Sequence, residues 1–414
     1  MIEFEKYKLE NGLTVILHKD ISTPLVTVNV LYKVGSRNEH ISKTGFAHLF
    51  EHLMFGGSEN IPDFDSPIQV AGGDNNAFTN SDLTNFYSIL PSENIETALW
   101  LESDRMKQLD FNQKSLDIQK KVVVEEFKET SINKPYGELW HALSDLAFTI
   151  HPYRWPTIGL KPSHIEDANL DDVKAFFEKH YRPNNAVLVI AGNMEIEKTK
   201  ASIEKWFSDI PSSVISNEKI PVEPQQLSFR TKTLIKEVSS DALYMAFHIP
   251  DRLDKSFGAF DMLSDIFSGG KSARFYQNLL KETEIFSSVF AYITGSIDPG
   301  LFVIEAKLIG DNKVDEARTL IWQELEKMKV ELISEKEIQK VKNSLISSIS
   351  FSEVSVIHKA INLAYYEMLG DATLINKQEE DYVDVTAEDI RQLSINTFTK
   401  ENCSEIIYLR KSQN

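Results

Sequence analysis

Residues 45–57 read GFAHLFEHLMFGG, and they contain the string H-x-x-E-H at His48, Glu51 and His52. Apolar residues recur at helical spacing through this stretch and a glycine pair closes it, which predicts a helix over 45–55. Positions i, i+3 and i+4 of a helix share one face, so the two imidazoles and the carboxylate point toward a common place. Three polar groups on an apolar stripe are costly in a core that gives them no function.

Two imidazoles four residues apart supply half of a tetrahedral zinc site. A carboxylate between them that is not itself a ligand can act as general base toward water at the metal. The order H-x-x-E-H is one of the motifs of zinc peptidases. We therefore predict that His48 and His52 bind one Zn²⁺ per chain, with Glu51 as the catalytic base. The alternative, two satisfied core histidines beside a chance glutamate, stays open at this point.

A zinc site of this kind needs a third protein ligand, and the acidic helix predicted over 113–130 offers Glu125, Glu126 and Glu129. Glu126 follows two valines at positions 122 and 123 and is predicted to face inward, whereas Glu125 is expected in solvent. An inward carboxylate needs a partner, and a metal ion is one. Spacing alone does not choose Glu126 over its neighbours.

The composition bounds the class of protein. A chain of 414 residues, 42% hydrophobic and 26% charged, is typical of a globular protein with two or three domains. The net charge of −18 argues against nucleic acid and anionic membranes as partners, and it fits plain solubility as well as a cationic ligand. The single cysteine excludes an internal disulfide and a Cys-rich zinc site. With no signal-peptide pattern, we expect a cytoplasmic location, or a periplasmic one if a leader was removed.

The chain is predicted to have two similar α+β halves. Residues 210–224, IPSSVISNEKIPVEP, contain three prolines and no helical or alternating period, which indicates a linker. We expect an N-terminal zinc-binding catalytic domain at 1–210, a linker at 211–226, and a C-terminal domain at 227–414 without the metal motif. Each half is predicted to form a mostly antiparallel sheet covered by helices. Strands are predicted over 13–18, 27–34, 87–90, 186–191, 243–249 and 301–308, and helices over 45–55, 93–106, 113–130, 137–147, 170–180 and 196–206.

Two pairs of segments suggest that the halves are copies. DVKAFFEKHYRPNNAVLVIAG, from Asp172, aligns without gaps with DIRQLSINTFTKENCSEIIYL, from Asp389. LFEHLMFGG (49–57) aligns with MLSDIFSGG (262–270), and this places Asp261, Ser264 and Asp265 opposite His48, Glu51 and His52. The second copy would then keep the helix and lack the ligands. Convergence of two amphipathic helices is the open alternative.

Several long motifs in order give the chain a resemblance to the pitrilysin-like (M16-type) zinc peptidases, which include mitochondrial processing peptidase. The stretches that carry it are NGLTVILHKD, VGSRNEHISKTGFAHLFEHLMFGG, AGGDNNAFTNSDLTNFYSILP, QKKVVVEEF, NKPYGELWHALSDLAFTIHPYRWPTIG and HYRPNNAVLVIAGN. The resemblance implies that His48, His52 and Glu126 are the zinc ligands and Glu51 the general base. It also implies a fold of two duplicated domains that form half of a clamshell. The family's acidic residue seven positions before the third ligand is replaced by Gln119.

The resemblance assigns a substrate-binding role to residues 76–79. In the family, the strand that corresponds to Asn76, Ala77, Phe78 and Thr79 is an edge strand that pairs with the backbone of an extended peptide. Main-chain pairing gives affinity with little sequence preference. On the sequence alone, an ordinary buried hairpin is the alternative.

The second half departs from the family pattern. Members usually carry an arginine and, seven residues later, a tyrosine that contact the substrate, and these positions hold Leu280 and Ser287 here. Loss of such a stabiliser costs on the order of 100-fold in rate. The resemblance therefore implies a zinc-bearing subunit of a heterodimer whose homologous partner supplies the Arg/Tyr pair. The alternatives are a self-sufficient homodimer, with Arg274 or Tyr276 as the stabiliser, and a non-catalytic scaffold.

Overall fold

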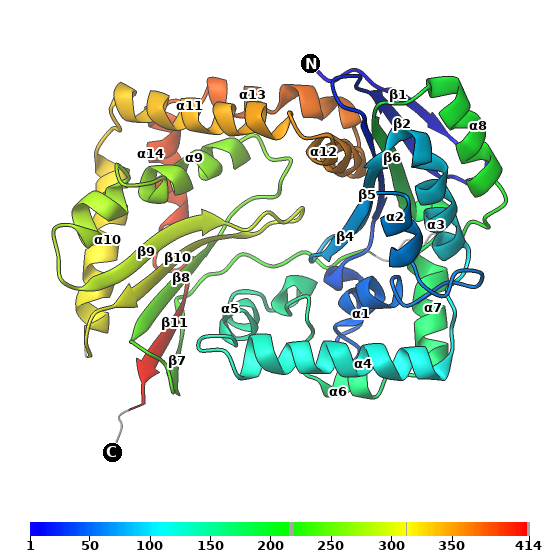
Figure 1. Cartoon of the computed structure of the whole chain (residues 1–414). Coiled ribbons are helices and arrows are strands. Elements are labelled where there is room, and N and C mark those ends of the chain that lie inside the picture. Colours follow the sequence, from blue (N-terminus) through cyan, green and yellow to red (C-terminus); the bar gives the residue numbers. More distant parts are fainter. Residues whose placement is uncertain (215–218, 312, 412–414) are drawn as a thin grey trace. The chain divides into compact units, whose positions relative to one another are not determined.

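The computed structural model describes residues 1–214, 219–311 and 313–411, and it has the predicted α+β class (Figure 1). Its contacts divide the chain into two compact units, each with its own sheet and core. Unit 1 comprises Met1–Lys128, Trp155–Ile220 and Ser350–Lys377, and unit 2 comprises Glu129–Arg154, Pro221–Ile349 and Gln378–Asn414. Part of the predicted linker, 215–218, lies outside the described residues.

Sheet 1 has the strand order β1-β2-β6-β3-β5-β4, and sheet 2 has the order β7-β11-β8-β10-β9. In sheet 1 the β2–β6 pair is parallel and the other pairs are antiparallel; in sheet 2 the β7–β11 pair is the parallel one. The strands are β1 (Glu5–Lys8), β2 (Thr14–Lys19), β3 (Leu25–Tyr32), β4 (Asp74–Thr79), β5 (Thr84–Pro91), β6 (Ala186–Gly192), β7 (Arg230–Lys236), β8 (Ala242–His248), β9 (Phe286–Ile293), β10 (Leu301–Leu308) and β11 (Cys403–Arg410).

Helices fill the connections between these strands. The α-helices are α1 (Phe46–Leu53), α2 (Asp65–Val70), α3 (Ile95–Lys107), α4 (Gln113–Phe127), α5 (Leu139–Ala147), α6 (Ser163–Glu166), α7 (Leu170–His180), α8 (Ile196–Phe207), α9 (Phe257–Ser268), α10 (Val314–Val330), α11 (Glu335–Ser352), α12 (Val356–Met368), α13 (Glu380–Val383) and α14 (Ala387–Thr397). Short helical turns are η1 (Ser36–Asn38), η2 (Ser92–Asn94), η3 (Lys128–Ile132), η4 (Pro152–Arg154), η5 (Pro183–Asn185), η6 (Tyr276–Leu280) and η7 (Ala372–Lys377).

The predicted duplication is present in the topology. Without β1, sheet 1 has the same order and the same parallel pair as sheet 2, so β2, β6, β3, β5 and β4 correspond to β7, β11, β8, β10 and β9. The helices α1 and α9 occupy the same connection, between the second and third of these strands along the chain. Asp261, Ser264 and Asp265 therefore lie on the helix that corresponds to the one with His48, Glu51 and His52.

The aligned segments at the end of each half also match locally. The helices α7 and α14 both have 11 residues, and in each copy the strand begins six residues after the helix ends. Both helices begin with the same kind of cap, because the side chains of Asn169 and Thr386 accept hydrogen bonds from the N–H groups of Asp172 and Asp389. Convergence of unrelated helices does not explain this agreement.

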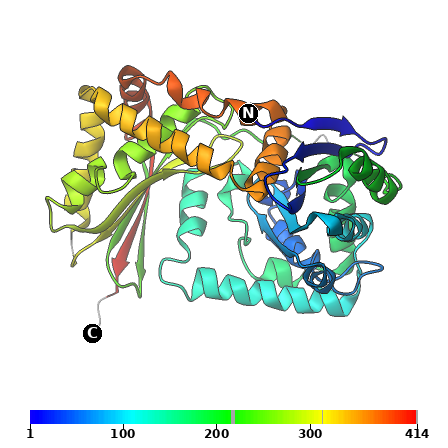
Figure 2. The same cartoon turned by 45° about the horizontal axis from the view of Figure 1, so that its top comes forward.

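The units depart from the predicted domain ranges in two exchanged segments. Residues Glu129–Arg154, from the first half of the sequence, belong to unit 2, where α5 packs on β7, β8 and β11. Residues Ser350–Lys377, from the second half, belong to unit 1, where α12 packs on β2, β3 and β6 (Figures 1 and 2). An amphipathic helix carries no local signal for which of two similar sheets it covers, so the sequence pattern assigned both helices to their neighbours in the chain.

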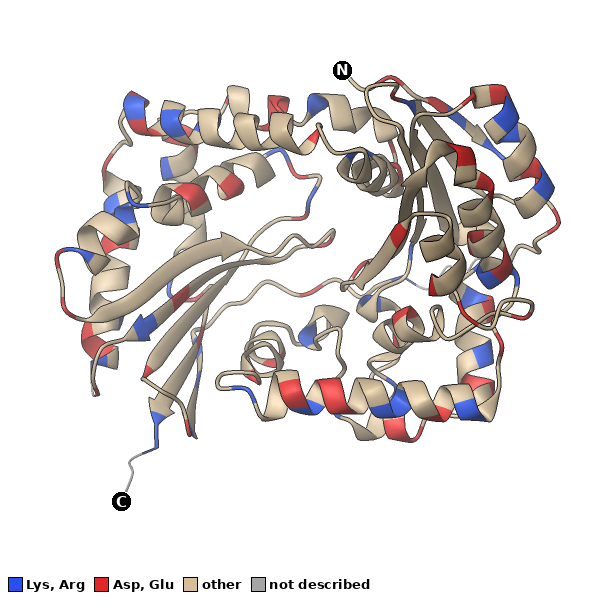
Figure 3. Cartoon of the chain, in the orientation of Figure 1, with Lys and Arg blue, Asp and Glu red and all other residues tan. Residues whose placement is uncertain are grey.

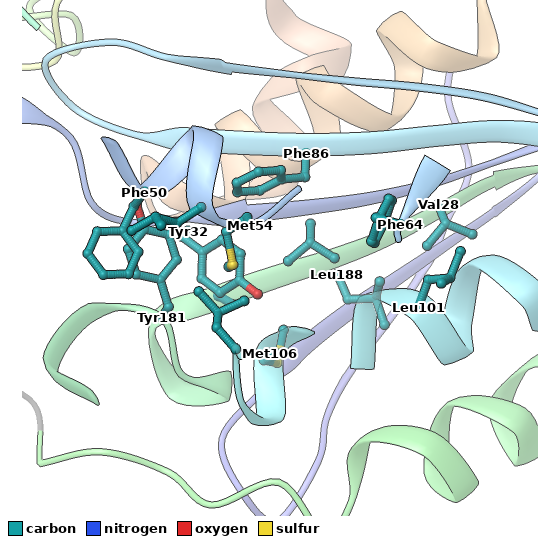
Figure 4. Packing of buried hydrophobic residues seen from close by; sticks show 14 of the residues in the cluster. Val28, Tyr32, Phe50, Met54, Phe64, Phe86, Leu101, Met106, Tyr181 and Leu188 are labelled. Atoms are coloured by element: carbon teal, nitrogen blue, oxygen red, sulfur yellow. The ribbon is translucent and has the colours of Figure 1, made fainter. Parts of the chain in front are cut away.

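The core of unit 1 holds α1 in place. Its buried residues Phe46, Leu49 and Phe50 are at most 2% exposed. Phe50 stacks on Tyr181, with ring centroids 4.9 Å apart, among buried side chains from β3, β5 and α3 (Figure 4). The apolar stripe of α1 is therefore anchored, and the opposite face is left for its polar residues.

The inner strands β3, β5, β6 and β8 carry no Lys, Arg, Asp or Glu, whereas α4 has acidic and basic residues along its length (Figure 3). No helix of the described residues is long and apolar enough to cross a membrane. The predicted helix over 113–130 ends earlier, at Phe127, and continues as the π-helical turn η3. The strands β1, β7 and β9 were not predicted. The strand β1 is short, and both β1 and β7 consist mainly of exposed polar residues.

Candidate metal centre

The structure brings the three predicted ligands together. The Oε2 atom of Glu126 lies 3.6 Å from Nε2 of His48 and 3.4 Å from Nε2 of His52. The three ligand atoms all lie within 4.8 Å of one another, and this is the only such His/Cys/Asp/Glu group found among the described residues. The two imidazoles come from one face of α1, with ring centroids 4.8 Å apart, and the carboxylate comes from α4, which packs against α1.

These distances fit a zinc ion. Four ligands at bond lengths of about 2.0–2.1 Å in a tetrahedron lie about 3.3–3.4 Å from one another, close to the two separations above. Two imidazoles and one carboxylate are a donor set of catalytic zinc sites, which keep a fourth position open. Burial, followed by the neighbouring imidazole of His52, lowers the pKa of His48 to about 4, so the neutral ring that a metal requires is favoured.

Glu51 lies on the same helix between the two histidines and is half-buried. Burial raises the pKa of its carboxyl group, and the nearby Glu126 adds to the rise. A hydrogen bond with the side chain of Thr79, on β4, and the neighbouring His52 act in the opposite direction. Glu51 therefore lies beside the candidate metal ligands and near Thr79 of the edge strand β4.

Glu126 is less buried than the sequence pattern predicts. Of the two valines expected to mark the inward side of α4, Val123 is fully buried but Val122 is 44% exposed, and the side chain of Glu126 is itself 40% exposed. Glu126 reaches the histidines because α4 packs beside α1 and Glu126 lies on the side of α4 that is next to α1. Glu125 pairs instead with Lys128, at 2.7 Å, and Glu129 is exposed.

Residues 76–79 lie in β4, which is the edge strand of sheet 1. The N–H group of Ala77 donates to the side chain of Asn76, at 2.8 Å, and that of Asn75 donates to Asp74, at 2.9 Å, instead of to β5. The alternate N–H groups of β4 therefore face away from the sheet. Phe78 is 37% exposed. The hairpin is present, and its first strand is open to pairing at this edge.

The remaining predicted positions lie on α4 and in unit 2. Gln119 is on α4 and is half-buried. Leu280 ends the turn η6 and packs partly against the core of unit 2, while Ser287 is exposed on β9 and donates to the carbonyl of Lys307 at 3.1 Å. Arg274 makes two hydrogen bonds of 2.9 Å with the carboxylate of Glu337.

One residue at the centre was not predicted. Glu39 is buried, and its carboxyl oxygens accept hydrogen bonds from the N–H groups of Gly45 and Ala47 at the start of α1. Burial raises the pKa of Glu39 to about 8, against the effect of these N–H groups. The sequence held one sign of such a residue. The N-cap of α1 is Gly45 and not a Ser, Thr, Asp or Asn, so the first N–H groups of the helix need an acceptor from elsewhere.

Two family models match most of the chain. The model described as "Insulinase (Peptidase family M16)" matches residues 14–159, and "Peptidase M16 inactive domain" matches residues 167–345. The chain belongs to peptidase family M16. The second match begins at residue 167, within the first copy, and its range includes α9, which has Asp261, Ser264 and Asp265 at the positions of His48, Glu51 and His52.

Named relatives of this M16 chain include zinc proteases and processing-peptidase subunits. "Zinc protease PqqE" of Helicobacter pylori is 28% identical over 98% of this chain and 92% of its own length. "Mitochondrial-processing peptidase subunit beta" of Saccharomyces cerevisiae is 28% identical over 50% of this chain and 45% of its own length. Among solved structures, a protease from Helicobacter pylori matches with a TM-score of 0.93 at 27% identity, covering 99% of this chain and all of that one.

Proposed function

We propose that this M16 chain is a zinc-dependent endopeptidase. The observation that carries the proposal is the convergence of His48, His52 and Glu126 with Glu51 beside them on α1. The relatives support the proposal, because proteins named zinc protease match nearly the whole length of this chain.

The roles of the chain's own residues follow from their positions. When bound, a zinc ion supplies Lewis acidity to the scissile carbonyl and to the attacking water. His48, His52 and Glu126 hold the ion and leave one side open toward Glu51. Glu51 takes the proton from the attacking water and later gives it to the leaving amine. The hydroxyl group of Thr79 lies beside the carboxyl group of Glu51, lowers its pKa and favours the ionised form that accepts the proton.

The proposed substrate is an extended peptide that pairs with β4. The outward N–H groups of Asn75 and Ala77 offer main-chain donors, and the side chain of Thr79 joins the same strand to Glu51. A peptide added as a further strand would therefore run past the base. Such pairing reads backbone more than side chains, so cleavage of many sequences is expected.

We further propose that the enzyme is the zinc-bearing subunit of a heterodimer. Leu280 has no hydrogen-bond donor in its side chain, and the hydroxyl group of Ser287 already donates to the carbonyl of Lys307, so neither replaces the arginine or tyrosine that would stabilise a developing oxyanion. The homodimer alternative relies on Arg274 or Tyr276. Arg274 is engaged by Glu337, which weakens that alternative. The match to a processing-peptidase beta subunit is consistent with a two-chain enzyme.

The activity is tested with the Glu51→Gln variant and a peptide library. The variant should bind one zinc ion per chain, measured by metal analysis, and lose turnover by at least about 1000-fold, because the base is removed without a ligand. Wild-type turnover in the variant would contradict the assignment of Glu51. Absence of zinc from the wild-type chain would favour the scaffold alternative.

The subunit role is tested separately. Purification from the source organism should yield a second homologous chain that carries an arginine and a tyrosine at the positions of Leu280 and Ser287. Adding that chain should raise peptidase activity sharply. Full activity of the isolated chain would contradict the heterodimer and favour the homodimer.

A further inference from the structure

The helix that carries both imidazoles starts without a capping side chain of its own. The N-cap of α1 is Gly45, at φ +88. Glycine has no side chain, so it cannot accept hydrogen bonds from the first N–H groups of the helix as a capping side chain would. Glu39, six residues earlier, takes this role. One carboxyl oxygen accepts from Gly45 at 2.9 Å and the other from Ala47 at 2.8 Å. Glu39 is 8% exposed, so water does not substitute for these bonds.

The segment that carries Glu39 is held from a distant part of the sequence. The indole Nε1 atom of Trp155 donates to the carbonyl of Ser36 at 2.9 Å, and the indole lies close enough to Glu39 to act against the rise of its pKa. The helix start is fixed on its other side as well. A side chain at Gly45 would lie 2.9 Å from the carbonyl oxygen of Ile158, so the two backbones are in close contact.

The orientation of His48 depends on this helix start. His48 is the third residue after the N-cap and directly follows Ala47. The N–H group of Ala47 donates a hydrogen bond to Glu39. A metal-ligating histidine is usually oriented by a hydrogen bond from its other ring nitrogen. The Nδ1 atom of His48 is buried and has no such partner within the part of the chain that the structure describes. The direction of its Nε2 atom is therefore set by the backbone of α1 and by packing.

We propose that Glu39 is a positioning residue of the metal centre, which fixes the first turn of α1 and thereby aims His48 at the metal. The proposal rests on the proposed zinc site. It differs from a cap that serves stability alone, because it ties one buried carboxyl group to ligand geometry. Loss of the Glu39 bonds would let the first turn fray, and among the described residues the Nδ1 atom of His48 has no hydrogen-bond partner that would keep the ring in place.

The experiment compares Glu39→Gln with the wild type in the full chain. Gln keeps one oxygen acceptor and places an amide NH₂ against the other backbone N–H group. Zinc affinity, measured by competition with a chelator, should weaken by about 10-fold. The visible spectrum of the Co²⁺-substituted variant should change in intensity, because the ligand geometry changes. Glu39→Asp, which is too short to reach both N–H groups, should show the same two effects if Glu39→Gln unfolds.

The matched control is Thr386→Ala, which removes the cap of α14 in unit 2. It should lower the melting temperature and leave zinc affinity and the Co²⁺ spectrum unchanged. Zinc affinity within twofold of wild type in Glu39→Gln, with an unchanged spectrum, overturns the proposal. If the wild type binds no zinc, the proposed function fails, and hydrogen exchange still decides the role of Glu39. Faster exchange confined to 45–53 in Glu39→Gln would support it, and unchanged exchange would overturn it.

Discussion

At the scale of single residues, the catalytic assignment depends on how one carboxylate is held. Burial and Glu126 raise the pKa of Glu51, whereas Thr79 and His52 lower it. Of the side chains that lower it, Thr79 is the one that carries no charge in either protonation state of its neighbours. Thr79 lies on the strand proposed to bind peptide, so it connects substrate binding to the base. This connection distinguishes Thr79 from the neighbouring residues of β4.

Replacing Thr79 with valine should therefore lower kcat more than it raises KM. Valine keeps the shape of the side chain and the outward backbone of β4, but it removes the hydrogen bond to Glu51. We expect a loss of about 10-fold in kcat, the size of one hydrogen bond to a charged group. Thr79→Ser keeps the hydroxyl and should retain most of the activity. Steady-state kinetics on one peptide would measure both, and equal kcat values for the two variants would refute the role of Thr79.

A second residue-scale prediction concerns pH. Asp20 accepts a hydrogen bond from Lys359 at 2.6 Å, and this bond, followed by that from Ser22, holds the pKa of Asp20 well below its ordinary value. A lowered pKa in the folded state stabilises the protein above the unfolded pKa, about 3.9, and the effect is lost as the pH falls through the folded pKa. Asp20→Asn should thus cost about 1 kcal/mol at pH 7, and the difference from wild type should narrow below about pH 4.

Urea denaturation between pH 3 and pH 8 measures this difference. The matched control is Glu93→Gln, a change at an exposed acidic residue, which should leave the curve close to that of wild type. A cost for Asp20→Asn that grows as the pH falls would contradict the sign worked out for Asp20.

At the scale of elements, local pattern and long-range placement differ in how well the sequence predicts them. The helix predicted over 170–180 agrees with α7 at both ends, because its cap and apolar period are local. The shared face of His48, Glu51 and His52 was predicted from helical geometry for the same reason. Glu126 could not be chosen over Glu125 by spacing, because that choice depends on how α4 packs beside α1.

The edge strand β4 gives a prediction about main-chain binding. The N–H group of Ala77 faces outward, so Ala77→Pro removes one donor to the substrate and no bond to β5. We expect kcat/KM to fall by about 5- to 10-fold, the value of one hydrogen bond. Ala77→Ser retains the N–H group and serves as the control. Similar kcat/KM values for the two variants, with melting temperatures equal to wild type, would argue against pairing at this position.

At the scale of the whole molecule, each half of the sequence contributes one helix to the compact unit formed mainly by the other half. The helices α5 and α12 follow α4 and α11, and each one belongs to the unit formed mainly by the other half of the sequence. Leu143 on α5 and Leu363 on α12 are both fully buried, the first in the core of sheet 2 and the second in that of sheet 1. The halves at 1–210 and 227–414 are therefore not the units that bury these residues.

This exchange predicts a crossed pattern of destabilisation. Leu143→Ala and Leu363→Ala each remove a fully buried side chain and should cost about 2–5 kcal/mol. Native-state hydrogen exchange should show that Leu363→Ala speeds exchange mainly in β2, β3 and β6, and that Leu143→Ala does so mainly in β7, β8 and β11. The reverse pattern, in which each substitution affects the sheet of its own half of the sequence, would contradict the two compact units. Each variant serves as the control for the other. A general loss of stability would speed exchange in both sheets in both variants, and so would differ from the expected result.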